Sequence, residues 1–98
     1  MVGENQNLQL HALIEGRVQG VGFRYFTLKS AKEKNLTGWV RNRRDSRVEV
    51  LAEGEQEQLN QLLADLRQGP ISADVENVEV NFSEAAGEFN DFGVKATI

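Results

Sequence analysis

Three glycines, one glutamine and two arginines are concentrated between Gly16 and Arg24, where an apolar run meets a helix-like segment. Glycine adopts positive φ easily and lets a bound group approach the backbone closely. Successive N–H groups in such a turn, together with a helix N-terminus, form a cradle that suits a tetrahedral oxyanion such as phosphate. The planar guanidinium of Arg24 would match the phosphate oxygens over the same cradle.

The same pattern has a structural explanation. Glycine-rich turns from strand to helix are common for steric reasons, and an arginine at a helix start is often simply solvated. The stretch also lacks the Gly-Lys-Ser/Thr of a P-loop and the glycine spacing of a dinucleotide fold. From spacing alone, both the anion site and the steric turn stay open.

Asn42 is the second candidate, because it shares the strand parity of the apolar Val40 and its side chain is expected on the buried side. A buried asparagine needs a hydrogen-bond partner, and a local backbone group of the following hairpin would satisfy it. Four arginines surround it: Arg41, Arg43, Arg44 and Arg47. They form either a solvated strand face or a patch that steers anionic substrates.

The elements that position these residues follow from apolar periodicity. Alternation from Leu8 to Val18 predicts a half-buried strand, and helical spacing predicts a helix from about Phe23 to Lys34. Two short strands, 37–43 and 47–53, predict a hairpin that turns at Arg44-Asp45-Ser46.

A second helix is predicted between Gly54 and Gly69, where four leucines recur at helical spacing: Leu59, Leu62, Leu63 and Leu66. Alternation predicts a strand over 73–82, with Val78, Val80 and Phe82 inward, and a short strand over 92–98. This order predicts an α+β fold, a ferredoxin-like α/β sandwich. It is βαββαβ with a short extra C-terminal strand, and two helices cover one face of an antiparallel sheet. Residues 8–98 are predicted to form this single domain, after a flexible N-terminal tail at 1–7.

Composition narrows the function classes. The chain of 98 residues is long enough for one modest core, and its formal charge of −4 argues against a general binder of nucleic acids or anionic membranes. Without cysteine, disulfides, thiolate catalysis and cysteine metal sites are excluded. No signal-peptide pattern occurs, and no apolar run approaches the ~20 residues that span a bilayer. A cytoplasmic location is expected.

Taken together, the two candidate patches resemble the acylphosphatase family. The segment GRVQGVGFR, Gly16 to Arg24, is similar to that family's first signature without a mismatch, and GWVRNRRDSRVEVLAEG, Gly38 to Gly54, is similar to its second. The resemblance extends from about Leu8 to the C-terminus and includes size and element order. Two separate motifs at the proper spacing are far more specific than a lone glycine pattern.

The resemblance implies hydrolysis of acyl phosphates, which are carboxyl-phosphate anhydrides, to carboxylate and inorganic phosphate without a metal or other cofactor. It places the family's catalytic arginine on Arg24 and its catalytic asparagine on Asn42, which would orient the attacking water. It places the phosphate-binding loop on Arg17, Val18, Gln19, Gly20, Val21 and Gly22. A monomer is expected, with an acyl phosphate as substrate, phosphate as product, and no nucleic-acid or membrane partner. The motifs leave the acyl group unspecified.

The second motif departs from the family at Ser46, where a glycine is usual. If the turn needs positive φ, serine strains it by ~1 kcal/mol, which affects the placement of Asn42. The alternative function is therefore a catalytically weak, acylphosphatase-like anion-binding module. A related domain begins a much larger carbamoyl-transferring hydrogenase maturation protein, but this chain ends at Ile98 and lacks that protein's zinc-binding cysteines.

Other polar and aromatic residues are assigned structural roles. His11 is expected to pack or to be exposed in mid-strand, and Glu49 and Glu53 to be surface charges without a histidine partner. Trp39 and Tyr25 would suit base stacking on a sheet, but no ribonucleoprotein aromatic motif accompanies them, so packing is expected for Trp39.

Overall fold

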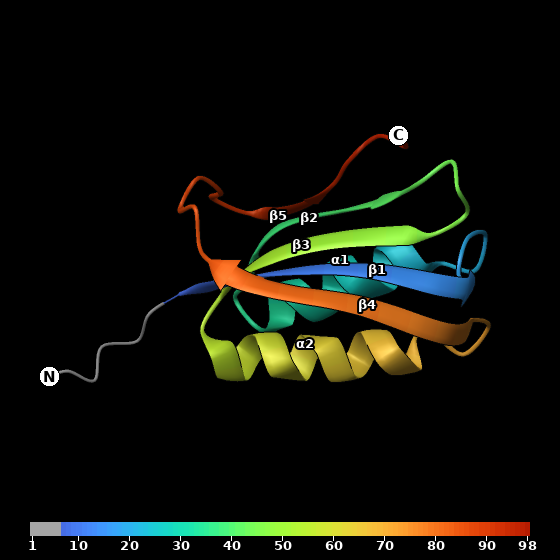
Figure 1. The fold of residues 1–98 in the computed structure, drawn as a ribbon, viewed down its shortest axis with the longest axis horizontal. Helices are drawn as coiled ribbons and strands as arrows, with labels where there is room; N and C mark the ends of the chain where they lie inside the picture. The colour runs from blue at the N-terminus through green and yellow to red at the C-terminus, as the bar shows by residue number, and fades with distance from the viewer. Residues whose placement is uncertain (1–6) are drawn as a thin grey trace, which may run out of the picture.

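The structure, a computed structural model, describes residues 7–98. It contains a five-stranded sheet in the order β4-β1-β3-β2-β5, with two helices packed on one face (Figure 1). The elements are β1 (Leu8–Arg17), α1 (Phe23–Glu33), β2 (Thr37–Asn42), β3 (Val48–Gly54), α2 (Gln56–Gln68), β4 (Asp74–Glu84) and β5 (Phe92–Val94). The predicted ferredoxin-like α+β fold is confirmed.

The tail predicted at residues 1–7 falls mostly outside the described residues, which exclude 1–6. The carbonyl oxygen of Asn7 accepts a hydrogen bond from the N–H of Ala85, just after β4. Neither helix within residues 7–98 is long and apolar enough to cross a membrane.

The core lies between the inward-facing residues of the strands and the apolar faces of the two helices. In β1 the alternate residues Leu10, Ala12 and Ile14 are completely buried beneath the helices. Three of the four leucines predicted for α2 are also completely buried, namely Leu59, Leu62 and Leu66. The fourth, Leu63, is partly buried. Phe82 lies opposite Leu10, as its parity predicts, but it is 41% exposed because β4 is an edge strand. Its predicted inward packing is therefore only partial.

The last strand differs from the prediction in length and direction. It covers Phe92–Val94 rather than 92–98, and it pairs in parallel with β2, so the sheet is not purely antiparallel. The chain beyond it still follows β2, because the N–H of Lys95 donates to the carbonyl oxygen of Val40 and that of Ile98 donates to Asn42. The C-terminal segment thus lies beside the end of β2 (Figure 1).

The β2–β3 hairpin holds Asn42 at its mouth. Asn42 pairs with Val48, and the turn is closed by hydrogen bonds from the N–H of Arg43 to the carbonyl oxygen of Arg47 and from Ser46 to Arg43. Ser46 has φ +74°, in the left-handed region that favours glycine. The turn therefore does require positive φ at this position, and the serine there is strained.

Candidate active site

A hollow of about 300 Å³ lies where the start of α1 faces β2 and β5. Arg24 from α1 and Asn42 from the end of β2 both line it, together with Gly20 and Gly22. The fold therefore brings together two candidate residues that are far apart in the sequence. Asn42 is half-buried and Arg24 is exposed, so both side chains can be reached from solvent.

Neither of these two side chains is engaged by the described part of the chain. Within residues 7–98, Asn42 makes no side-chain hydrogen bond to the hairpin backbone, which was its alternative role, and Arg24 makes no ion pair. The main chain of Asn42 is held on both sides, by its pairing with Val48 and by the N–H of Ile98. Both polar side chains are thus available to a ligand.

The glycine-rich turn before α1 presents unpaired backbone N–H groups. Across residues 7–98, no N–H of residues 18–22 donates to a main-chain carbonyl in the turn and loop hydrogen bonds. Helix α1 follows Gly22 (φ +80°) with no side-chain cap and with no acidic residue in its first turn. Its free N–H groups and the positive end of its dipole are therefore open to an anion.

Only three of the six residues predicted to form the phosphate loop line the hollow. These are Val18, Gly20 and Gly22. The other three lie elsewhere: Arg17 is exposed at the end of β1, Gln19 contacts the hairpin, and Val21 packs partly against the core. Gly20 (φ +74°) and Gly22 (φ +80°) both lie in the left-handed region, so the turn bends and its residues do not all face the hollow.

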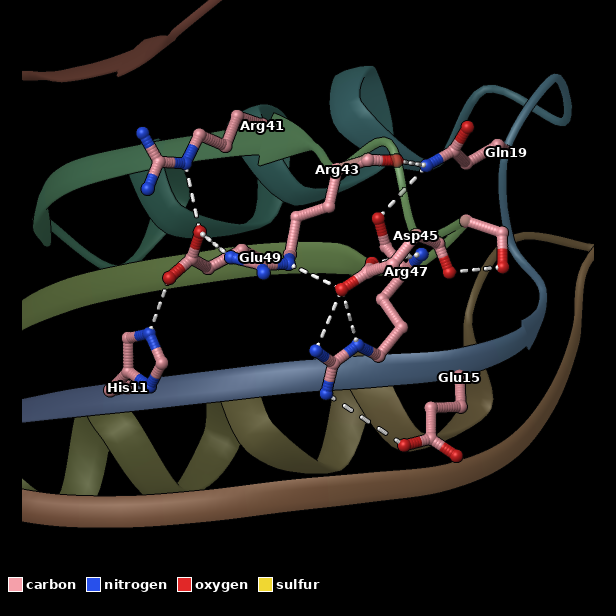
Figure 2. A network of polar contacts seen from close by, with 9 residues as sticks. His11, Glu15, Gln19, Arg41, Arg43, Asp45, Arg47 and Glu49 are labelled. Atoms are coloured by element: carbon pink, nitrogen blue, oxygen red, sulfur yellow. Dashed lines mark hydrogen bonds and ion pairs between the residues drawn. The ribbon is translucent and has the colours of Figure 1, made fainter. Parts of the chain in front are cut away.

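Gln19 connects the turn to the hairpin that follows Asn42. Its side-chain nitrogen donates hydrogen bonds to the main-chain carbonyl oxygens of Arg43, at 2.7 Å, and Arg47, at 2.9 Å (Figure 2). The glycine-rich turn and the end of β2 are therefore held at a fixed distance from each other.

Glu49 lies at the centre of a polar network on the sheet face away from the helices (Figure 2). It is 6% exposed; its Oε2 is 2.6 Å from Nε2 of His11, and its Oε1 accepts from Nε of Arg41 at 2.8 Å. The expectation of a surface charge without a histidine partner is wrong for this residue. Burial raises the pKa of Glu49, but the bonds from His11 and Arg41 lower it, and the net pKa lies below its ordinary value.

Glu53 is also buried, at 4% exposure, so the expectation of a surface charge is wrong here too. Its carboxylate accepts hydrogen bonds from the Gln9 side chain at 2.7 Å and from the N–H groups of Ala86 at 2.7 Å and Gly87 at 3.1 Å. Burial raises the pKa of Glu53, while these donors lower it to below its ordinary value. Glu53 thereby fixes the segment between β4 and β5.

The arginines near Asn42 mostly have acidic partners of their own. Asp45 accepts from Arg47 at 2.8 Å and from Arg43 at 3.0 Å, and these two hydrogen bonds hold the pKa of Asp45 well below its usual range. With Arg41 bound to Glu49, only Arg44 of this cluster makes no ion pair among the residues from 7 onward. The cluster is therefore largely neutralised, which weakens its predicted role in steering substrates.

The two aromatic residues that suggested base stacking lie on different surfaces. Trp39 is on the outer sheet face between two cations, with Cζ of Arg41 4.5 Å and Nζ of Lys95 5.1 Å from its ring centroid. Tyr25 is on α1 and lines the hollow. The packing role expected for Trp39 fits these contacts. Residues 7–98 contain no group of three or more His, Asp or Glu side chains arranged to hold a metal ion.

Sequence reasoning missed three apolar residues at the hollow. Tyr25 and Leu28 of α1 and Val94 of β5 line it beside Arg24 and Asn42. Only the contact between α1 and β5 brings Val94 here, and neither motif contains it. The helical spacing of Arg24, Tyr25 and Leu28 is the one signal available in the sequence, because positions three and four apart share a helix face.

Comparison with known proteins places this site in context. A family model described as Acylphosphatase matches residues 10–94. A protein named Acylphosphatase from Acaryochloris marina is 48% identical over 85 residues, which are 87% of this chain and 90% of that relative. The crystal structure of acylphosphatase from Bacillus subtilis superposes with a TM-score of 0.87 and 39% identity, covering 90% of this chain and 98% of that one. The crystal structure of full-length HypF in the phosphate- and nucleotide-bound form has a TM-score of 0.82 and 28% identity, but only 13% of that chain is covered.

These superpositions establish the class of protein as a small ferredoxin-like α+β sandwich. The family model and the relative from Acaryochloris marina show further that the chain belongs to the acylphosphatase family.

Proposed function

We propose that this protein hydrolyses acyl phosphates to a carboxylate and inorganic phosphate. One observation carries the proposal. Arg24 and Asn42 share a single hollow with the N–H-rich turn before α1, in a chain of the acylphosphatase family. The similar proteins from Acaryochloris marina and Bacillus subtilis are named acylphosphatases, which supports the same substrate class.

The phosphoryl group binds against the turn from Arg17 to Gly22. The unpaired N–H groups of this turn and of the first turn of α1 bind its oxygens, and the guanidinium of Arg24 adds a charge-assisted contact. Phosphoryl transfer depends mainly on positioning and on stabilising charge over the three equatorial oxygens. The backbone N–H groups would act as a preorganised oxyanion hole does, because they belong to the main chain and need no rearrangement of a side chain.

Asn42 orients the attacking water. Its amide oxygen accepts a hydrogen bond and its amide nitrogen donates one, so it fixes a water molecule without removing its proton. The water oxygen forms a bond to phosphorus while the bond between phosphorus and the acyl oxygen breaks. The acyl group leaves as a carboxylate with the bonding electron pair, and the phosphate product keeps both water protons.

No metal is required in this mechanism. A carboxylate is a stable leaving group, and Arg24 and the backbone N–H groups supply the positive potential that a metal would otherwise provide. We propose further that the protein acts as a monomer, since a single chain is sufficient to form the hollow, and that it is located in the cytoplasm.

The test is hydrolysis of acetyl phosphate and benzoyl phosphate in the presence of a chelator. Wild type is compared with Arg24→Ala and Asn42→Ala, and with Arg44→Ala as the matched control. Arg44 is an exposed arginine two residues from Asn42 and does not line the hollow. Loss of one preorganised contact lowers the rate roughly a hundredfold. We expect both site variants to fall by at least this factor while they remain folded, and Arg44→Ala to retain the wild-type rate.

The strained Ser46 favours one alternative, an anion-binding module that turns over weakly or not at all. In that case wild type shows no hydrolysis, yet inorganic phosphate raises its melting temperature and Arg24→Ala abolishes this protection. Absence of both hydrolysis and protection would overturn both functions.

A further inference from the structure

One wall of the hollow is apolar and open to solvent. Tyr25 is 70% exposed and Val94 is 49% exposed, and these are two of only five large hydrophobic side chains exposed in residues 7–98. Leu28 lies beside them and is partly buried against the core. Exposed apolar side chains that gather at a concave site indicate a binding function, whereas single ones scattered over a surface do not.

This wall is continuous with the candidate catalytic residues. Leu28 is one helical turn after both Arg24 and Tyr25, so these three residues share the side of α1 that lines the hollow. Val94 pairs with Val40, which is two residues before Asn42 on the same face of β2. An acyl phosphate whose phosphorus lies between Arg24 and Asn42 therefore has its acyl carbon within reach of the apolar wall.

The charges around the hollow limit which acyl groups fit. Arg24 is the only charged residue that lines it within the described chain, and the phosphoryl group uses it. An acyl group with a second carboxylate or phosphate would lie against Tyr25, Leu28 and Val94 without a cation, at the cost of desolvating its charge. A short acetyl group would leave the wall uncovered.

We propose that Tyr25, Leu28 and Val94 form an acyl-binding subsite, and that the preferred substrates are acyl phosphates with an uncharged apolar acyl group, aromatic or branched. This inference rests on the proposed function. It adds the substrate class, which the phosphate-binding turn does not determine.

The experiment compares kcat/KM for benzoyl phosphate and acetyl phosphate. A buried apolar group of this size changes discrimination by about tenfold or more, so wild type is expected to prefer benzoyl phosphate by about this factor. The double variant Tyr25→Ser/Val94→Thr makes this apolar wall polar while it keeps the shape of Val94, and it should abolish most of this preference. Ile71→Ser is the control, because Ile71 is fully exposed and lies outside the hollow. Its ratio of the two kcat/KM values should equal that of wild type.

A binding measurement separates failure of the subsite from failure of the proposed function. Benzylphosphonate and methylphosphonate carry stable carbon–phosphorus bonds, and their Kd values report the apolar contact without turnover. If wild type hydrolyses neither acyl phosphate but binds benzylphosphonate about tenfold more tightly than methylphosphonate, and the double variant does not, the subsite stands and the hydrolase fails. If acetyl and benzoyl phosphate are hydrolysed with equal kcat/KM, or if the double variant keeps the wild-type preference in both measurements, the subsite is overturned.

Discussion

The side-chain amide of Gln19 donates a 2.7 Å hydrogen bond to the main-chain carbonyl oxygen of Arg43, the residue directly after Asn42. That carbonyl also accepts from the N–H of Ser46, and the second acceptor of Gln19, the carbonyl of Arg47, also accepts from the N–H of Arg43. Gln19 therefore completes the hydrogen bonding of a turn that is already closed. Its contribution is to fix the distance between the glycine-rich turn and Asn42.

Replacing Gln19 by methionine should uncouple these two parts of the site. Methionine is similar in size but has no donor, and each carbonyl keeps its backbone partner, so the free energy of unfolding should fall by only about 1 kcal/mol. We expect kcat for acetyl phosphate to fall about tenfold, because Asn42 is less well positioned. The small loss of stability cannot explain such a fall, since nearly all of the protein stays folded. Gln61→Met, on the exposed side of α2, is the control. An unchanged kcat, with only urea stability reduced, would show that Gln19 has a purely structural role.

Ser46→Gly should stabilise the protein. Serine at φ +74° is strained, and glycine relieves roughly 1 kcal/mol there. For a domain of this size, such a gain raises the melting temperature by about 4–8 °C. Ser72→Gly is the matched control. Ser72 is an exposed loop serine without positive φ, where glycine should destabilise by increasing the entropy of the unfolded chain. If activity rises together with stability in Ser46→Gly, the hairpin strain also affects Asn42. A lower melting temperature for this variant would contradict the assignment of strain.

Stability should decrease in acid, with Glu49 as one of the causes. Its pKa in the folded state is below the ordinary value of 4.5, so its stabilising contribution is complete above that pH and is lost as the pH falls through the lower folded-state value. Glu49→Gln should lower the free energy of unfolding at pH 7 by on the order of 2 kcal/mol, since hydrogen bonds to a charged group are lost. The same variant should depend less on pH below about 4.5.

Glu88→Gln, at an exposed position between β4 and β5, is the control for this titration and should keep the wild-type acid dependence. Urea unfolding from pH 3 to pH 8 measures all three proteins. If Glu49→Gln and wild type lose stability in parallel between pH 5 and pH 3, the buried carboxylate is not the group that titrates.

The sequence predicted the elements that have a clear period and missed what depends on pairing. The alternation of Leu10, Ala12 and Ile14 and the leucines of α2 each specify one buried face, so β1 and α2 were predicted correctly. The parallel pairing of β5 with β2 has no period of its own in three residues. Its direction follows from the position of the chain after β4, which only the folded sheet fixes.

For the site, the two motifs indicated candidate residues but not how these residues are arranged. Periodicity placed Asn42 inward, and the structure puts it in the same hollow as Arg24. The prediction that Glu49 is exposed is wrong, because the sequence pattern does not show which residues cover it. Arg41 lies directly across the hairpin and His11 lies on the neighbouring strand. Alternation in a strand shows which face of the sheet a residue lies on, but not which other residues cover it there. Val94 was missed for the same reason.

Two glycines with positive φ should respond differently to alanine. At Gly38 (φ +132°) a Cβ would collide with the carbonyl oxygen of Leu51, whereas at Gly22 (φ +80°) a Cβ would meet nothing within 4 Å. Gly22→Ala should therefore cost only the strain of its backbone, about 1 kcal/mol, and Gly38→Ala about 3 kcal/mol, since the β2–β3 pair must separate. Gly22 also lines the hollow, so its variant should lose part of the protection by inorganic phosphate, measured as the shift in melting temperature. Gly38→Ala, if it folds, should keep the full shift. Equal shifts in Gly22→Ala and wild type would mean that phosphate does not approach the backbone at the start of α1.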